Sequence, residues 1–133
     1  MLNIEQHIER HAQNAPERVA MVLNGEELTY GELRQRTMLR AQHYQGMQRK
    51  GVVLRASCDA DFLISYFAVH VAGAVAVLLP AAATPEQVVR MEKSLQGFCF
   101  PEGSADVLFT TGTTGAPKGV VIGTRAIAPL SLI

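Results

Sequence analysis

The spacing of apolar residues changes several times along the chain, and each change predicts a different element of secondary structure. Residues 3–14 place an apolar side chain at every fourth position and end before Pro16, which is typical of an amphipathic helix. Two short runs, 19–23 and 26–29, flank the pair Asn24-Gly25. Asn-Gly is a preferred two-residue turn between antiparallel strands, so these runs predict a β-hairpin.

After the hairpin, helical and strand-like segments alternate with short turns between them. Thr29 and Glu32 form a capping-box pair that predicts a helix start, and Thr84 and Gln87 form a second pair with Pro85 at the first helical position. Such alternation is typical of parallel βαβ units, so we expect an α/β fold. The expected elements are helices at about 30–45, 61–72 and 85–95 and strands at 52–54, 74–79 and 107–109, the first two of these strands being buried.

One apolar stretch, residues 62–83, raises the possibility of a membrane span. It contains no Asp, Glu, Lys or Arg and is long enough to cross a bilayer. Gly73 and Pro80 interrupt it, however, and the composition changes to Ala and Val repeats after Gly73. A buried helix followed by a buried strand explains these features better, so we expect no membrane span.

The charges of the chain balance, and this limits the possible partners. Twelve basic and twelve acidic residues give a net charge of zero, which offers no electrostatic case for binding nucleic acid or an anionic membrane. Basic residues gather between Arg34 and Lys50, but the neutral balance and the nearby acids favour a solvated face. Glu5 and Glu9 leave no room for the apolar core of a secretory signal, so we expect a cytoplasmic protein.

Neither the cysteines nor the histidines have a spacing that predicts a metal site. Cys58 and Cys99 are far apart and lack metal-ligand spacing, so we expect buried free thiols. His7 and His11 are four residues apart on the first predicted helix, but no third ligand is near them in the sequence. We therefore expect these two histidines at the surface.

Residues 108–121 have the composition of a binding loop rather than of scaffold. An apolar run leads into a Thr/Gly segment with one lysine, and a second apolar run follows, which predicts two strands joined by a polar loop. Glycines let a ligand approach the backbone, and threonines offer hydroxyl and main-chain N–H donors to anionic oxygens. The candidate phosphate-binding residues are Thr110, Thr111, Gly112, Thr113, Thr114, Gly115 and Lys118.

The segment from Thr110 to Lys118, which we name the Thr/Gly loop, is not a Walker A motif. Ala116 and Pro117 stand where that motif requires Lys and then Ser or Thr. An ordinary hairpin connection is the alternative interpretation. The expected βαβ units nevertheless place the loop after the carboxyl end of a strand, which is where α/β sheets bind their ligands.

Residues 110–119 also resemble the signature of a known superfamily. Thr-Thr-Gly-Thr-Thr-Gly-Ala-Pro-Lys-Gly is similar to the Thr/Ser-Gly-Thr-Thr-Gly-x-Pro-Lys-Gly motif of adenylate-forming (AMP-binding) enzymes, which include acyl-CoA synthetases, luciferases and peptide-synthetase adenylation domains. Residues 28–33 and 72–75 resemble further segments of that superfamily. The resemblance implies a truncated N-terminal domain. In it, 1–29 is a lead-in helix and hairpin, 30–106 forms βαβ units, 107–123 is strand, loop and strand, and 124–133 begins a helix capped by Thr124.

The same resemblance implies a chemistry for the Thr/Gly loop. It implies that the loop closes over the β- and γ-phosphates of Mg-ATP while a carboxylic acid substrate attacks the α-phosphate. Coenzyme A or a carrier phosphopantetheine would then take the acyl group. No catalytic residue or metal ligand is assignable within this stretch, and the magnesium ligands are expected outside it. We therefore expect the N-terminal segment of an ATP-dependent carboxylate ligase, inactive by itself; the alternatives are a non-catalytic nucleotide or phosphate-binding module and an interaction remnant.

Overall fold

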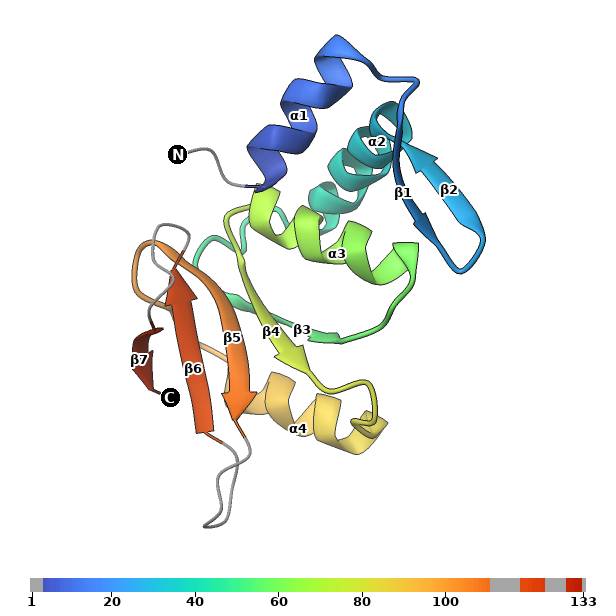
Figure 1. Ribbon diagram of the computed structural model, residues 1–133. Coiled ribbons are helices and arrows are strands. Elements are labelled where there is room, and N and C mark those ends of the chain that lie inside the picture. The colour runs from blue at the N-terminus through green and yellow to red at the C-terminus, as the bar shows by residue number, and fades with distance from the viewer. Residues whose placement is uncertain (1–3, 111–117, 124–128, 133) are drawn as a thin grey trace.

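The computed structural model describes residues 4–110, 118–123 and 129–132, which form helices and strands in alternation (Figure 1). An N-terminal helix precedes a two-stranded hairpin, in which Asn24 and Gly25 adopt positive φ angles of 50° and 79° as the predicted turn requires. The elements are α1 (Ile4–Asn14), β1 (Val19–Leu23), β2 (Glu26–Thr29), α2 (Tyr30–Ala41), the 3₁₀ turn η1 (Gln42–Tyr44), β3 (Gly51–Arg55), α3 (Ala60–Val71), β4 (Val75–Leu79), α4 (Pro85–Ser94), β5 (Ser104–Thr110), β6 (Lys118–Gly123) and β7 (Pro129–Leu132).

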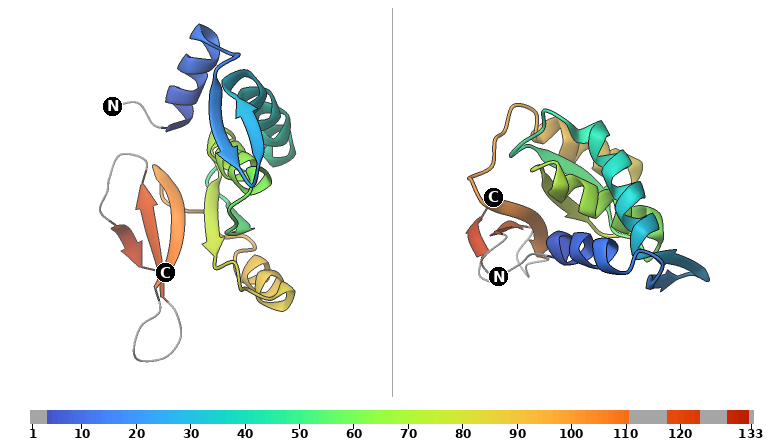
Figure 2. Two further views of the ribbon diagram at one scale, coloured as in Figure 1. Left: turned by 45° about the vertical axis from the view of Figure 1, so that its right-hand side comes forward. Right: turned by 90° about the horizontal axis from the view of Figure 1, so that it is seen from above.

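The main sheet has five strands in the order β3-β4-β5-β6-β7. The first three strands are parallel, whereas β6 pairs antiparallel with β5, and β7 antiparallel with β6. Helices α3 and α4 pack on opposite faces of the parallel strands, and α1 and α2 pack against α3 (Figures 1 and 2). The expected α/β fold with parallel βαβ units is therefore confirmed.

The side chains of β4 show why helices are needed on both faces of the sheet. Val75 and Val77 are fully buried on one face, where they pack with Phe100 against α4. Ala76 points the other way and packs with Val69 of α3. A central parallel strand that is apolar at every position must be covered on both sides, and the alternation of two helices in the sequence supplies that cover.

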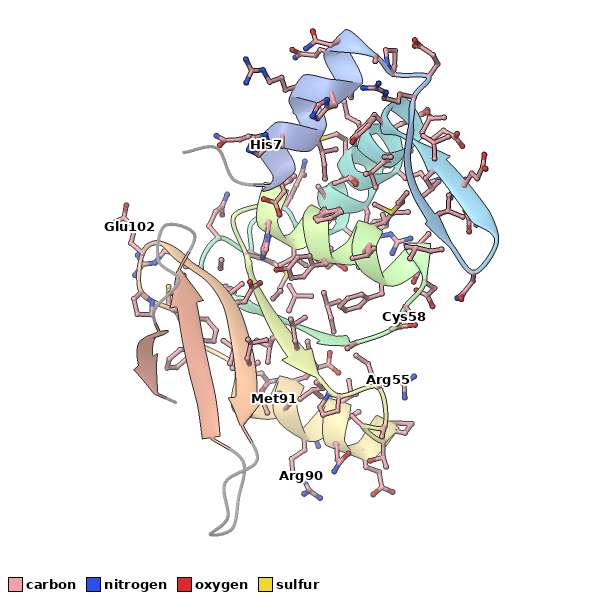
Figure 3. All side chains as sticks on the ribbon, in the orientation of Figure 1. His7, Arg55, Cys58, Arg90, Met91 and Glu102 are labelled. Atoms are coloured by element: carbon pink, nitrogen blue, oxygen red, sulfur yellow. The ribbon has the colours of Figure 1, made fainter. Side chains whose placement is uncertain are left out.

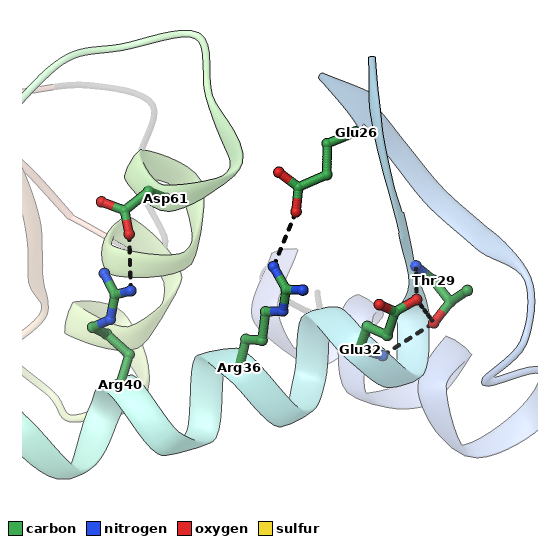
Figure 4. A network of polar contacts seen from close by, with 6 residues as sticks. All are labelled: Glu26, Thr29, Glu32, Arg36, Arg40 and Asp61. Carbon is green, nitrogen blue, oxygen red and sulfur yellow. Dashed lines mark hydrogen bonds and ion pairs between the residues drawn. The ribbon is translucent and has the colours of Figure 1, made fainter. Parts of the chain in front are cut away.

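Side-chain caps begin helices α2, α3 and α4 near the predicted positions. The Thr29 hydroxyl accepts a hydrogen bond from the Glu32 backbone N–H at 3.1 Å, and the Glu32 carboxylate accepts one from the Thr29 N–H at 3.4 Å (Figure 4). Thr84 and Gln87 repeat this reciprocal arrangement at the start of α4. At the start of α3, the Asp59 side chain accepts the capping hydrogen bond from the Phe62 N–H at 2.8 Å.

The basic residues of α2 pair with acids from neighbouring elements. Arg36 Nη1 lies 3.0 Å from Glu26 Oε1, and Arg40 Nη2 lies 2.9 Å from Asp61 Oδ1 (Figure 4). Exposed pairs of this kind contribute at most about 1 kcal/mol each to stability. Their effect here is to balance the positive charge of the helix surface, which agrees with the solvated face that the sequence predicts.

The last described residues correct one prediction. The possible cap at Thr124 predicted the start of a helix over residues 124–133, whereas Pro129–Leu132 forms strand β7, which pairs with β6. Residues 124–128 lie outside the described part of the chain. A capping signal is local, and it contains no information about the unpaired backbone groups that the edge of β6 offers to a further strand.

Burial also differs from prediction at two places. Cys58 and Cys99 are free but exposed, which corrects the expectation of buried thiols. Cys58 lies in the surface connection before α3 (Figure 3), and Cys99 lies in the connection after α4. Strand β3 is only partly buried, because it forms the edge of the sheet.

The apolar stretch 62–83 is divided between α3 and β4, and no helix among the described residues is long and apolar enough to cross a membrane.

Candidate functional site

The described ends of the Thr/Gly loop lie on adjacent antiparallel strands. The ladder between β5 and β6 extends from the pair Ser104 and Gly123 to the pair Thr110 and Lys118. This last pair consists of the first and the last residue of the Thr/Gly loop. The structure therefore places the first and the last candidate residue opposite each other. The other candidates lie outside the described residues, and their placement stays a prediction: Thr111, Gly112, Thr113, Thr114 and Gly115.

The Thr/Gly loop begins at the carboxyl edge of the parallel strands. At the ends of β3 and β4, Arg55 is paired with Leu79. Val77 is paired with Val107, so β5 continues to Thr110 at that same edge (Figure 1). The expectation that the loop follows the carboxyl end of a parallel strand is confirmed. This edge is where open α/β sheets bind ligands.

A polar cavity of about 570 Å³ opens at this edge between β3 and α3. Arg55, from the end of β3, donates a hydrogen bond of 3.0 Å to a backbone carbonyl of the connection before α4. The backbone N–H of Phe62, and then the hydroxyl of Ser57, donate to Asp59 and lower the pKa of its carboxyl group. The lining contains two carboxylates, Asp59 and Asp61, and one guanidinium group, Arg55. The cavity by itself therefore lacks the positive charge that a phosphate site needs.

A cluster of titratable side chains, which the sequence pattern did not reveal, links α1, α3 and β5. His70 of α3 lies between two carboxylates, with Nε2 at 2.7 Å from Asp106 Oδ1 and Nδ1 at 2.5 Å from Glu5 Oε1. The Tyr66 hydroxyl donates to Asp106 Oδ2 at 2.9 Å. The side chains of Glu5, His70 and Asp106 are only 12%, 11% and 17% exposed. The signal that could have revealed this cluster is the presence of polar residues within apolar segments. These residues are Asp106 in β5 and, four positions apart on α3, Tyr66 and His70.

The two carboxylates keep His70 in its charged form. Burial disfavours the imidazolium and by itself lowers the pKa of His70, but hydrogen bonds to Asp106 and Glu5, together with their negative charges, raise the pKa to about 9. Burial and then the charge of Asp106 raise the pKa of the Tyr66 hydroxyl, so this group stays a donor. At neutral pH the cluster therefore holds one imidazolium that donates an N–H to each carboxylate.

The fold and the position of the Thr/Gly loop define an α/β protein with a candidate ligand site at the carboxyl edge of its sheet. The chain belongs to the AMP-binding enzyme family, whose sequence profile matches residues 8–96. The matched range begins within α1 and includes α4, but it ends before β5. Membership in the family therefore rests on the helices and parallel strands that precede the Thr/Gly loop.

Two curated relatives resemble most of this chain at 24% identity. VraA of Staphylococcus epidermidis, which is named as a long chain fatty acid-CoA ligase, aligns with 89% of this chain and 31% of its own length. A subunit of the linear gramicidin synthase of Brevibacillus parabrevis aligns with 98% of this chain and 2% of its own length. The chain thus spans less than a third of either relative.

Solved structures share the fold. The N-terminal subdomain of NpsA from Klebsiella oxytoca, in complex with 3-hydroxyanthranilyl-AMSN, has a TM-score of 0.74 and 21% identity, over 94% of this chain and 41% of that one. VinN in complex with L-aspartate has a TM-score of 0.72 and 16% identity, over 93% of this chain and 48% of that one. At these identities the likeness establishes the fold, which agrees with the N-terminal domain that the sequence implies.

Proposed function

We propose that the Thr/Gly loop holds the β- and γ-phosphates of ATP in an acid-thiol ligase of the AMP-binding enzyme family. The observation that carries this proposal is the pairing of Thr110 with Lys118 where β5 ends at the carboxyl edge of the sheet. Neighbouring strands lie about 5 Å apart, so the two ends of a donor-rich segment are held close together. The residues between them include three threonines and two glycines, which suits recognition of anionic oxygens through hydroxyl and backbone N–H groups.

The proposed reaction has two steps. A carboxylate oxygen of the acid attacks the α-phosphorus of ATP, the bond to the bridging oxygen breaks, and pyrophosphate leaves with the electron pair. Donors of the Thr/Gly loop and the Lys118 ammonium group stabilise the charge of the leaving pyrophosphate. A thiolate of coenzyme A or of a carrier phosphopantetheine then attacks the acyl carbon, and AMP leaves. The name of VraA, a fatty acid-CoA ligase, supports the thioester step.

Magnesium belongs to this proposal as the ion that accompanies the ATP phosphates. Phosphate oxygens are hard ligands of the kind that Mg²⁺ prefers. Among the described residues, no three His, Cys, Asp or Glu side chains are grouped so that they could hold a metal ion. We therefore assign no magnesium ligand to the described part of this chain and derive no step from one.

Titration of the chain with Mg-ATP and with pyrophosphate tests the assignment of the Thr/Gly loop. Lys118→Ala should weaken pyrophosphate binding about tenfold to a hundredfold, because a hydrogen bond to a charged group contributes about 1.5–3 kcal/mol. Lys50→Ala is the matched control, since Lys50 is exposed and precedes β3 at the opposite, amino edge of the sheet. Equal affinities of the wild type and Lys118→Ala would overturn the assignment.

The reaction class requires a second experiment, which is carboxylate-dependent exchange of labelled pyrophosphate into ATP by the intact natural gene product, because the segment by itself is expected to be inactive. Fatty acids, aromatic acids and amino acids should all be offered, because the names of the similar proteins and their complexes include a fatty acid, anthranilyl compounds and L-aspartate. Exchange with one class of acid identifies the substrate class. Nucleotide binding by the intact gene product without exchange on any acid would instead favour a nucleotide-binding module that does not catalyse.

A further inference from the structure

The strands that flank the Thr/Gly loop are joined to the parallel strands by a short ladder. β3 and β4 pair from Gly51 and Val75 to Arg55 and Leu79, whereas β4 and β5 are in register only at Ala76 with Asp106 and Val77 with Val107. β5 pairs along most of its length with β6 instead. Strands β5, β6 and β7 accordingly stand beside the α/β layers in the left view of Figure 2. The register of β5 with β4 is thus shorter than that of β3 with β4, although Val107 of β5 packs with Val77 in the buried core.

Asp106 lies at this junction and is held by two side chains of α3. Its Oδ1 is 2.7 Å from His70 Nε2, and its Oδ2 accepts a hydrogen bond of 2.9 Å from the Tyr66 hydroxyl. Tyr66 and His70 are four residues apart, so they stand on the same face of the helix. The β5–β6 register shifts between Ser104 and Asp106, and such bulges re-aim a neighbouring side chain. β5 is thus attached to α3 by bonds at both oxygens of one carboxylate.

A second carboxylate extends this attachment to the N-terminal helix. Glu5, in the first turn of α1, lies with Oε1 at 2.5 Å from His70 Nδ1. Only the imidazolium form of His70 can donate to both carboxylates, because the neutral ring has a single N–H. The groups that face His70 are Glu5 from α1, Asp106 from β5 and the ring of Tyr66, whose centroid is 4.4 Å from that of the imidazole. These contacts connect α1 to β5 through His70 of α3.

We propose that Glu5, His70 and Asp106 form an ionic latch that orients β5 and thereby positions the strand ends Thr110 and Lys118 for phosphate binding, which rests on the function proposed above. Thr110 follows Asp106 by four residues along the strand, a separation of about 13 Å. A tilt of β5 at Asp106 therefore displaces the end of the strand. Within the latch these are positioning residues, since none of them is expected to touch the nucleotide.

Nuclear magnetic resonance tests the latch in the absence of any nucleotide. The imidazole signals of His70 should titrate with a pKa of about 9, and those of the exposed His43 serve as the internal reference. The amide signals of Val107 and Leu108 in β5 should shift at the His70 midpoint, and in Asp106→Asn this midpoint should move to lower pH. A His70 midpoint at or below 6.5, or β5 amide signals that do not follow it, would overturn the latch.

Pyrophosphate titration tests the positioning role. Glu5→Gln and Asp106→Asn remove one charge each with little change of shape, and each should weaken binding by at least threefold, whereas Glu17→Gln at an exposed position should not. The affinity for pyrophosphate should also fall as the pH rises through the pKa of His70. The fall should be smaller in Asp106→Asn, because this variant lacks the carboxylate that pairs with His70 but retains Lys118. If Asp106→Asn matches the wild type in affinity and in pH profile, β5 does not need the latch and the positioning role is wrong.

The magnetic resonance experiment and the pyrophosphate titration together distinguish a failure of the proposed function from a failure of the latch proposal. If the wild-type chain binds neither ATP nor pyrophosphate, the proposed function fails, and the magnetic resonance arm alone decides whether the latch exists. If the wild type binds pyrophosphate and Lys118→Ala does not, but the latch variants bind as the wild type does, the proposed function stands and the latch proposal is overturned. A loss of affinity in the latch variants but not in Glu17→Gln supports both.

Discussion

His70 Nε2 lies 2.7 Å from Asp106 Oδ1, across the junction between helix α3 and the strand that leads into the Thr/Gly loop. The two residues are 36 positions apart in the sequence, and the imidazole reaches Glu5 of α1 with its other nitrogen. A charged group held between two carboxylates at low exposure couples the folding of the chain to pH, because folding changes the affinity of His70 for its proton.

The first prediction concerns this pH dependence. Folding raises the pKa of His70 from about 6.5 to about 9, so the stability that it contributes is complete below pH 6.5 and is lost as the pH rises to 9. The difference corresponds to roughly 3 kcal/mol. Urea unfolding between pH 6 and 10 should show this loss in the wild type and in the control His43→Ala. An equal loss in His70→Ala would assign the pH dependence to other groups.

A second prediction concerns the other bond to Asp106. Tyr66→Phe keeps the ring and removes only the hydroxyl that donates to Asp106 Oδ2. The variant should lower the free energy of unfolding by roughly 1 kcal/mol, the net contribution of a typical hydrogen bond, or somewhat more because the acceptor is a charged carboxylate. Tyr44→Phe is the control, since no described residue hydrogen-bonds to the Tyr44 hydroxyl. Equal stabilities of the two variants in urea would contradict the prediction.

Gly51 provides a third prediction, because β3 passes very close to its neighbours there. A Cβ atom at this position would lie 3.0 Å from Val77 Cγ2 and 3.1 Å from both Leu95 Cδ1 and Phe100 Cε2. Since Phe100 and Val77 are fully buried, these side chains have little room to move. Gly51→Ala should destabilise the fold by about 1–3 kcal/mol. Lys50→Ala, at the exposed preceding residue, should change stability by less than about 0.5 kcal/mol in the same thermal or urea experiment.

The cap of α4 supports a fourth prediction. The Thr84 hydroxyl accepts a hydrogen bond of 3.2 Å from the Gln87 N–H, and the Gln87 side chain accepts one of 2.9 Å from the Thr84 N–H. Thr84→Ala should cost about 1 kcal/mol, whereas Thr84→Ser keeps the acceptor oxygen and should stay close to the wild type. If the serine variant is as unstable as the alanine variant, the threonine contributes through packing rather than through the cap.

Much of the fold was predictable because its signals act within one turn of the chain. Thr29 with Glu32 and Thr84 with Gln87 begin helices through bonds that span three residues. Asn24 with Gly25 sets the hairpin through backbone angles at two positions. Such signals do not depend on the rest of the molecule, so the sequence reveals them directly. The alternation of apolar runs then indicates parallel βαβ units through the same local reasoning.

The parts that were not predicted depend on partners that are remote in the sequence. Strand β7 requires β6 as a neighbour, and nothing between residues 124 and 133 specifies that pairing. His70 meets Glu5 across 65 positions, and its neighbours in α3 suggest only a buried helix. For the candidate site, the sequence predicted a polar loop from Thr110 to Lys118 between two strands, and the structure pairs these two residues at the ends of β5 and β6. It did not reveal that Asp106 joins one of these strands to α3.

The last prediction concerns Thr37, a buried residue of α2 that is only 6% exposed. Its hydroxyl oxygen has no hydrogen-bond partner among the described residues, and it borders a cavity of about 30 Å³ lined by residues of α1, α2 and α3. A buried hydroxyl without a partner is destabilising, so Thr37→Val, which has nearly the same shape, should leave the free energy of unfolding unchanged or raise it by up to about 1 kcal/mol. Thr37→Ser keeps the hydroxyl and removes the methyl group, and it should lower stability by about 1 kcal/mol. Thermal unfolding of both variants separates the two contributions, and a Thr37→Val variant less stable than Thr37→Ser would mean that the hydroxyl is hydrogen-bonded in solution.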